Sequence, residues 1–129
     1  MPSLPSFALA GLAIVLICTI AAGRSPISRW QVPAAICAAF VAYSLWPILT
    51  LGPLGFWPKH VGDPWSVQIW FDLLCAIGVG WALLAPRARA AGMVPWPWLA
   101  LILATGSIGL LAMLARVLYC EGATRGPTA

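Results

Sequence analysis

Long apolar stretches alternate with short polar or proline-rich breaks along this chain. The apolar stretches cover residues 7–23, 32–51, 66–85 and 96–119. Each approaches the ~20 residues that cross ~30 Å of hydrocarbon, and none alternates apolar and polar residues as a barrel strand would. The pattern predicts an all-α membrane protein. We expect a four-transmembrane-helix bundle with short loops, forming a single transmembrane domain over residues 1–129, with the tail 122–129 disordered.

The breaks contain residues that begin or end helices. A glycine followed by a proline closes each of the first two stretches. Asp63 is suited to cap the third helix, with Pro64 in its first turn, where a missing N–H costs nothing. Pro86 is expected to end that helix.

The first stretch has an alternative reading as a cleaved signal peptide, since small residues occupy positions 21–23. No Lys or Arg precedes Phe7, where a signal peptide would be positively charged. We therefore expect a retained helix.

The composition supports the membrane assignment. Hydrophobic residues make up 62% of the chain and charged residues 8%, whereas soluble domains carry about 25% charged residues. These values exclude a soluble globular domain, a disordered tail and a secreted disulfide scaffold. The seven Lys and Arg residues are scattered along the chain, so no nucleic-acid-binding surface is expected either.

The basic residues also indicate the orientation, because cytoplasmic loops carry an excess of Lys and Arg. With four spans, one side of the membrane holds Arg24, Arg29, Arg87 and Arg89, and the other holds Lys59, Arg116 and Arg125. This predicts that both termini lie outside, together with the loop 52–65. The small difference leaves dual insertion open.

Most tryptophans lie near the ends of the predicted helices, where their rings prefer the headgroup layer. These are Trp30, Trp46, Trp57, Trp65, Trp96 and Trp98. An aromatic cage for a cation is the alternative. Trp70 and Trp81 lie further inside and are the better candidates for lining a site.

Asp72 lies seven residues past Trp65, about 10 Å along the third predicted helix. An ionised carboxylate in a membrane helix costs ~2.5 to 3.5 kcal/mol on insertion scales. Helical spacing places Gln68, Cys75 and Val79 on the same face. We expect this polar stripe to face the interior of the bundle.

The fourth predicted helix offers a partner for Asp72. One of its faces carries small residues in the middle and polar residues near the outer end. This face consists of Thr105, Gly109, Ala112, Arg116 and Tyr119. Arg116 is expected at the depth of Asp72, which predicts a buried ion pair between them. The pair either fixes helix packing or tunes Asp72 as a proton donor, a proton acceptor or an ion ligand.

Residues 63–121 resemble a bacterial family of small inner-membrane proteins, domain of unknown function 2834. The resemblance rests on Asp63-Pro64, Asp72, Gly92-Met93 with Trp96, Gly109 with Tyr119, and Glu121. It departs at Ala115 and Cys120, where the family often has a proline and a basic residue. It implies a small membrane protein whose recurring residue is the carboxylate at Asp72, and no established activity.

Other chemistry has little support in the sequence. The four cysteines have no metal or redox spacing, and His60 is the only histidine. We expect no metal and no cofactor.

Three function classes remain open. The first is a non-enzymatic accessory, interaction or lipid-binding helical bundle, with membrane lipids and a membrane protein or a second copy as partners. The second is an enzyme acting on an isoprenoid-like substrate, with Asp72 as general acid. The third is a small dimeric transporter with Asp72 as coupling carboxylate. The sequence favours the first class, with a site of Asp72, Arg116, Gln68, Thr105, Tyr119 and Trp70.

Overall fold

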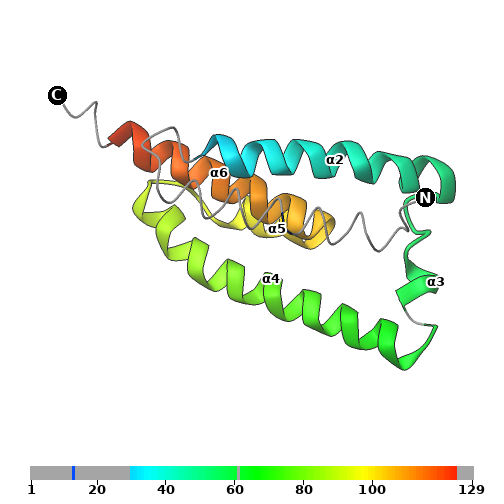
Figure 1. The fold of residues 1–129 in the computed structure, drawn as a ribbon. Helices are drawn as coiled ribbons and strands as arrows, with labels where there is room; N and C mark the ends of the chain where they lie inside the picture. Colours follow the sequence, from blue (N-terminus) through cyan, green and yellow to red (C-terminus); the bar gives the residue numbers. More distant parts are fainter. Residues whose placement is uncertain (1–12, 14–29, 61, 125–129) are drawn as a thin grey trace.

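The computed structural model describes residues 13, 30–60 and 62–124. Its helices are α2 (Gln31–Leu51), α3 (Trp57–His60), α4 (Pro64–Ala90), α5 (Trp96–Thr105) and α6 (Ser107–Thr124) (Figure 1). Over the described residues the structure is all-helical, as predicted. Three helices, α2, α4 and α6, are long and apolar enough to cross a membrane. The first predicted helix, 7–23, lies outside the described residues apart from Ala13.

Helix α2 confirms the second predicted stretch, beginning one residue earlier than expected. It continues through Pro47, and the hydroxyl of Thr50 donates a hydrogen bond of 2.9 Å to the carbonyl of Trp46. The helix ends at Gly52, which has φ +78° and donates its N–H to the carbonyl of Ile48 at 2.9 Å. A glycine tolerates this left-handed backbone without strain.

Helix α4 begins as the sequence predicts. The carboxylate of Asp63 accepts hydrogen bonds from the backbone N–H of Ser66 at 3.1 Å and from its hydroxyl at 2.6 Å. These bonds, with that of the Ser66 hydroxyl the largest cause, lower the pKa of the exposed Asp63 carboxyl. Pro64 occupies the first helical position.

The end of α4 differs from the prediction. Pro86 removes one intrahelical hydrogen bond, yet the helix runs on to Ala90. It stops at Gly92, which has φ +74°. The N–H of Gly92 donates to the carbonyl of Arg89 at 3.0 Å, and that of Met93 to the carbonyl of Ala88 at 2.8 Å. These two bonds form a Schellman motif, so the glycine ends the helix and the proline does not.

The predicted single helix 96–119 is wrong. The chain turns back at Gly106, with φ +62° and ψ −124°, so that α6 packs antiparallel against α5 (Figure 1). The contact is backbone to backbone, because a Cβ atom at Gly109 would lie 2.8 Å from both N and Cα of Ile102. Helix α6 then extends to Thr124, so residues 122–124 are helical, contrary to the expected disordered tail.

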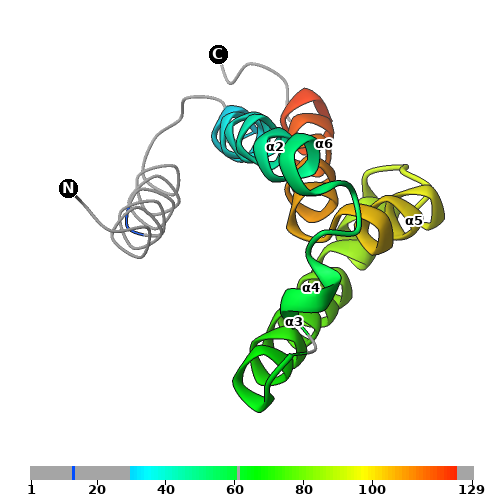
Figure 2. The same cartoon turned by 90° about the vertical axis from the view of Figure 1, so that its right-hand side faces the viewer.

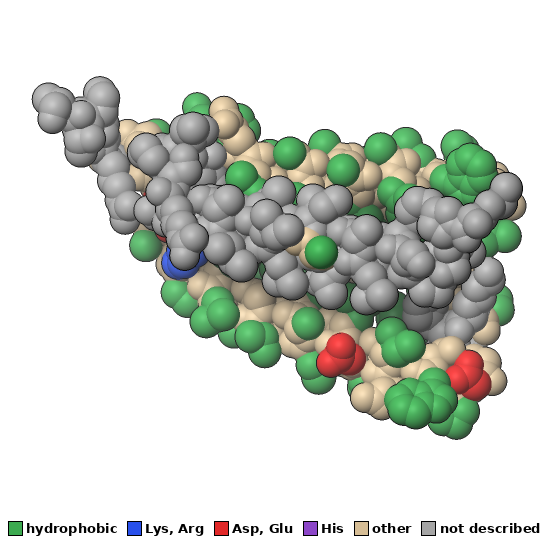
Figure 3. Space-filling model, in the orientation of Figure 1, with side chains coloured by type: hydrophobic (Ala, Val, Ile, Leu, Met, Phe, Trp, Pro, Cys, Tyr) green, Lys and Arg blue, Asp and Glu red, His purple; other side chains and the backbone are tan. Residues whose placement is uncertain are grey.

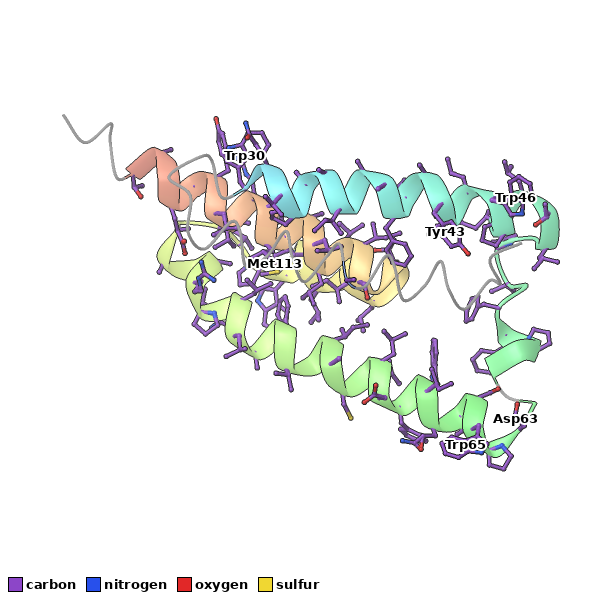
Figure 4. All side chains as sticks on the ribbon, viewed as in Figure 1. Trp30, Tyr43, Trp46, Asp63, Trp65 and Met113 are labelled. Carbon is purple, nitrogen blue, oxygen red and sulfur yellow. The ribbon has the colours of Figure 1, made fainter. Side chains whose placement is uncertain are left out.

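Helix α6 is the centre of the described bundle. It packs against α2, α5 and α4, and the end-on view in Figure 2 shows it between α2 and α5. The core comprises Ile102 of α5, Met113 and Val117 of α6, and Leu84 and Ala88 of α4. Met113 lies in the middle of these helices in Figure 4. This core occupies the end where α4 terminates, and α2 and α4 diverge toward α3 (Figure 1).

Candidate functional site

The predicted site residues lie in separate places. Asp72 and Gln68 line a groove on α4, and Arg116 and Tyr119 line a pocket at the other end of the bundle. Thr105 is at the tip of the α5–α6 hairpin, where its hydroxyl donates to the carbonyl of Leu101 at 2.7 Å. The sequence analysis therefore assigned to one site residues that belong to two, the Asp72 groove and the Arg116 pocket.

Within the described part of the chain, the Asp72 groove is lined by residues of one helix, α4. The groove is open to the surface and has a volume of about 470 Å³. It is lined by Pro64, Val67, Gln68, Phe71, Asp72 and Cys75. Asp72 is exposed, and it makes no hydrogen bond or ion pair with any described residue. Figure 3 shows acidic side chains on the otherwise largely hydrophobic surface of this region.

The polar stripe does not face the described core, contrary to the prediction. On a helix, nine residues separate opposite faces, and Trp81 lies nine residues after Asp72. Trp81 and Ile77 pack against the core cluster, together with the buried Leu84 and Ala88. Asp72 therefore points away from α6.

The predicted ion pair between Asp72 and Arg116 is absent. Ile77 lies level with the hairpin tip, since its Cδ1 atom is 3.7 Å from the position of a Cβ at Gly106. Asp72 lies five residues before that level on α4, and Arg116 ten residues beyond it on α6, which runs parallel to α4. At 1.5 Å per residue the two are about 22 Å apart along the helix axes, beyond side-chain reach. The prediction failed because it assumed a straight fourth helix antiparallel to the third.

A different ion pair joins α4 to α6. The guanidinium of Arg87 donates to both carboxylate oxygens of Glu121, at 3.0 and 2.8 Å. It is the one ion pair among the residues that the structure describes. The sequence analysis missed this pair because it ended the third helix before Pro86, which places Arg87 in a loop. Gly92, a residue typical of helix ends, indicates the longer helix on which Arg87 lies.

The Arg116 pocket lies where α2 begins, beside the first turn of α5 and the second half of α6. It has a volume of about 380 Å³ and is lined by Trp30, Ala34, Trp98, Ala112, Ala115, Arg116 and Tyr119. The rings of Trp30 and Tyr119 meet edge to face with centroids 5.5 Å apart. The guanidinium carbon of Arg116 lies 5.5 Å from the centre of the Tyr119 ring, a cation–π distance.

The inner tryptophans do not converge on Asp72. Trp70 stacks on Phe56, with ring centroids 6.0 Å apart and planes 23° apart. Trp81 packs against the core cluster. At the helix ends, Trp30 lies at the start of α2, and Trp46 and Trp65 lie at the opposite end of the molecule (Figure 4). Trp46 is 76% exposed and Trp65 77% exposed, an arrangement typical of interfacial anchors.

No three His, Cys, Asp or Glu side chains within the described ranges are placed to hold a metal ion. Cys37, Cys75 and Cys120 are free thiols, and the Sγ of Cys37 donates to the carbonyl of Ile108 at 3.5 Å. Cys18 lies outside the described residues.

Comparisons with family models, with curated proteins and with solved structures find no match to this chain. The resemblance of residues 63–121 to a bacterial inner-membrane family stays a prediction.

Proposed function

We propose that this chain is a small, non-enzymatic integral membrane protein that associates with another membrane protein through the Asp72 surface of α4. This surface consists of Gln68, Asp72, Cys75 and Val79. The observation that carries the proposal is the position of Asp72, about 12 Å from the start of an apolar helix and turned away from the described core. Following the resemblance, we place the protein in the bacterial inner (plasma) membrane.

The energetics of a carboxylate in a membrane support an interaction surface. Lipid tails donate no hydrogen bonds, so an ionised Asp72 facing lipid carries the full insertion cost of ~2.5 to 3.5 kcal/mol. A neighbouring helix with a basic or amide side chain at the same depth offsets that cost, and Gln68 one turn away adds a second polar contact. We therefore infer a partner helix that carries such a donor.

The enzyme and transporter alternatives have no comparable observation behind them. The Asp72 groove is open, the described residues that line it come from one helix, and they include no second acid. A general acid for a lipophilic substrate works best in an enclosed, water-poor cavity.

The proposed orientation places the Arg87 end of the bundle in the cytoplasm. Because the hairpin turns α6 back, Arg116 shares that end with Arg87 and Arg89, whereas α3 carries Lys59 at the opposite end. The positive-inside rule then favours a cytoplasmic end for α6, in place of the external C-terminus expected from four full spans. A cytoplasm-specific reporter fused after Ala129 should be active; an inactive fusion with normal expression would contradict this orientation.

Site-specific photo-crosslinking in intact membranes tests the partner. A photoreactive amino acid replaces Cys75, which lies on the Asp72 surface, and in a matched control it replaces Leu74. Both positions are exposed and lie at the same depth, but Leu74 is about 200° around the helix from Asp72. We expect a discrete adduct with a second polypeptide from position 75 and none from position 74.

The adduct should also depend on the carboxylate. Asp72→Leu should abolish it, and Asp72→Asn, which keeps hydrogen-bonding capacity, should retain part of it. Adducts with lipid alone, adducts with residues 1–29 of the same chain, or equal yields from both positions would overturn the proposal.

A further inference from the structure

The polar side chains among the described residues that line the Arg116 pocket can all donate hydrogen bonds. They are the guanidinium of Arg116, the indoles of Trp30 and Trp98, and the phenol of Tyr119. None of these groups makes a hydrogen bond or an ion pair with a described residue. No acid lines the pocket, and Glu121, on the same helix, is bound by Arg87 through both of its oxygens.

This arrangement fits an anion with several acceptor oxygens. A guanidinium binds phosphate through parallel N–H bonds, and the cation–π contact with Tyr119 holds Arg116 beside the cavity. Trp30 caps the start of α2, Trp98 belongs to α5, and Arg116 and Tyr119 belong to α6, so these donor side chains line one space of about 380 Å³ from three parts of the chain. The Trp30–Tyr119 edge-to-face contact fixes the side of the pocket formed by α2.

The rest of the pocket is apolar, and its position matches a lipid headgroup. Ala34, Ala112 and Ala115 provide its remaining lining. The pocket opens where α2 begins and α5 begins, the level at which tryptophans typically mark the boundary between headgroups and hydrocarbon. A soluble phosphate would gain nothing from these apolar residues, whereas the glycerol and upper acyl chain of a phospholipid would pack against them.

We propose that the Arg116 pocket binds the phosphodiester headgroup of an anionic phospholipid from the leaflet at the Arg87 end of the bundle. The guanidinium and the indoles hold the phosphate oxygens, and the alanines contact the glycerol region. This site is separate from the Asp72 surface of α4, and it does not depend on the proposed protein partner.

Native mass spectrometry of the full chain in mild detergent tests the proposal. Phosphatidylglycerol, phosphatidylcholine and inorganic phosphate are added separately at equal concentrations. We expect phosphatidylglycerol to bind about tenfold more tightly than phosphatidylcholine, because both lipids present the same phosphodiester but the trimethylammonium of phosphatidylcholine is repelled by the Arg116 guanidinium. Inorganic phosphate should neither bind nor compete.

Two exposed arginines give a matched pair of variants. Arg116→Gln should remove the preference for phosphatidylglycerol, and Arg89→Gln, at the same end of the bundle but outside the pocket, should retain it. Equal melting temperatures would show that both variants are folded. Equal retention of the two lipids by the unmodified protein, equal losses in both variants, or displacement of phosphatidylglycerol by inorganic phosphate would overturn the proposal.

Discussion

Gly109→Ala is the most direct test of the α5–α6 hairpin. The new Cβ would lie 2.8 Å from N and Cα of Ile102 and 2.9 Å from the carbonyl carbon of Leu101. All three atoms belong to the backbone of α5, so no side chain can rotate away. Ordinary contact requires at least 3.4 Å, so α6 must move away from α5 by about 0.6 Å.

This movement separates helices that share the best-packed part of the molecule. Ile102 is 1% exposed, and Met113, one turn after Gly109, is fully buried. A gap of 0.5–1 Å already forfeits a quarter to a half of a dispersion contact. Overpacking of this kind costs about 1–3 kcal/mol. We therefore expect Gly109→Ala to lower the free energy of unfolding by that amount.

Gly78→Ala is the matched control, since a Cβ at Gly78 meets no atom within 4 Å. It should leave stability unchanged or raise it, because alanine has the higher helix propensity. Unfolding in mixed detergent micelles by titration with sodium dodecyl sulfate, followed by tryptophan fluorescence, measures both variants. If residues 96–119 formed one straight helix, Gly109→Ala would change the free energy of unfolding in the same direction as Gly78→Ala. Gly109→Ala as stable as the unmodified protein would therefore refute the hairpin.

Three further predictions concern the elements around this hairpin. Gly106→Ala should destabilise the protein by about 1–3 kcal/mol in the same titration, because φ +62° with ψ −124° is strained for any residue with a Cβ. A double-mutant cycle of Arg87→Ala and Glu121→Ala should give a coupling energy of about 0.2–1 kcal/mol that falls with added salt; strictly additive losses would contradict the pair. The lowered pKa of Asp63 means that its cap stabilises the protein above the ordinary value of 3.8 and is lost as the pH falls through the lowered pKa. The melting temperature of Asp63→Asn should therefore fall less at acidic pH than that of the unmodified protein. An identical pH profile for the two proteins would argue against the cap.

The sequence predicts helix ends well where one residue type has one structural use. Asp63 followed by Pro64 predicts a helix start, since the carboxylate caps the helix and the first turn is where a proline costs no hydrogen bond. At the other end of α4 two signals compete. Pro86 indicates a stop and Gly92 indicates another, and packing of Ala88 in the core favours the longer helix.

The turn at Gly106 could not be predicted from hydrophobicity. The run from 96 to 119 is apolar almost throughout, so a straight helix and a hairpin bury equally apolar faces and give the same pattern. The error carried over to the candidate site. A straight helix brings Arg116 toward Asp72, whereas the hairpin returns it to the end that contains Arg87.

The α5–α6 hairpin also bears on how the protein enters the membrane. Helix α5 is about 15 Å long, half the thickness of the hydrocarbon layer, and α6 returns to the side where α4 ends. In the proposed orientation, no polar segment between Ala91 and Thr124 is translocated after α4 has inserted. The contacts between α5 and α6 are local in sequence, so this orientation lets the hairpin enter the membrane as one unit beside α4.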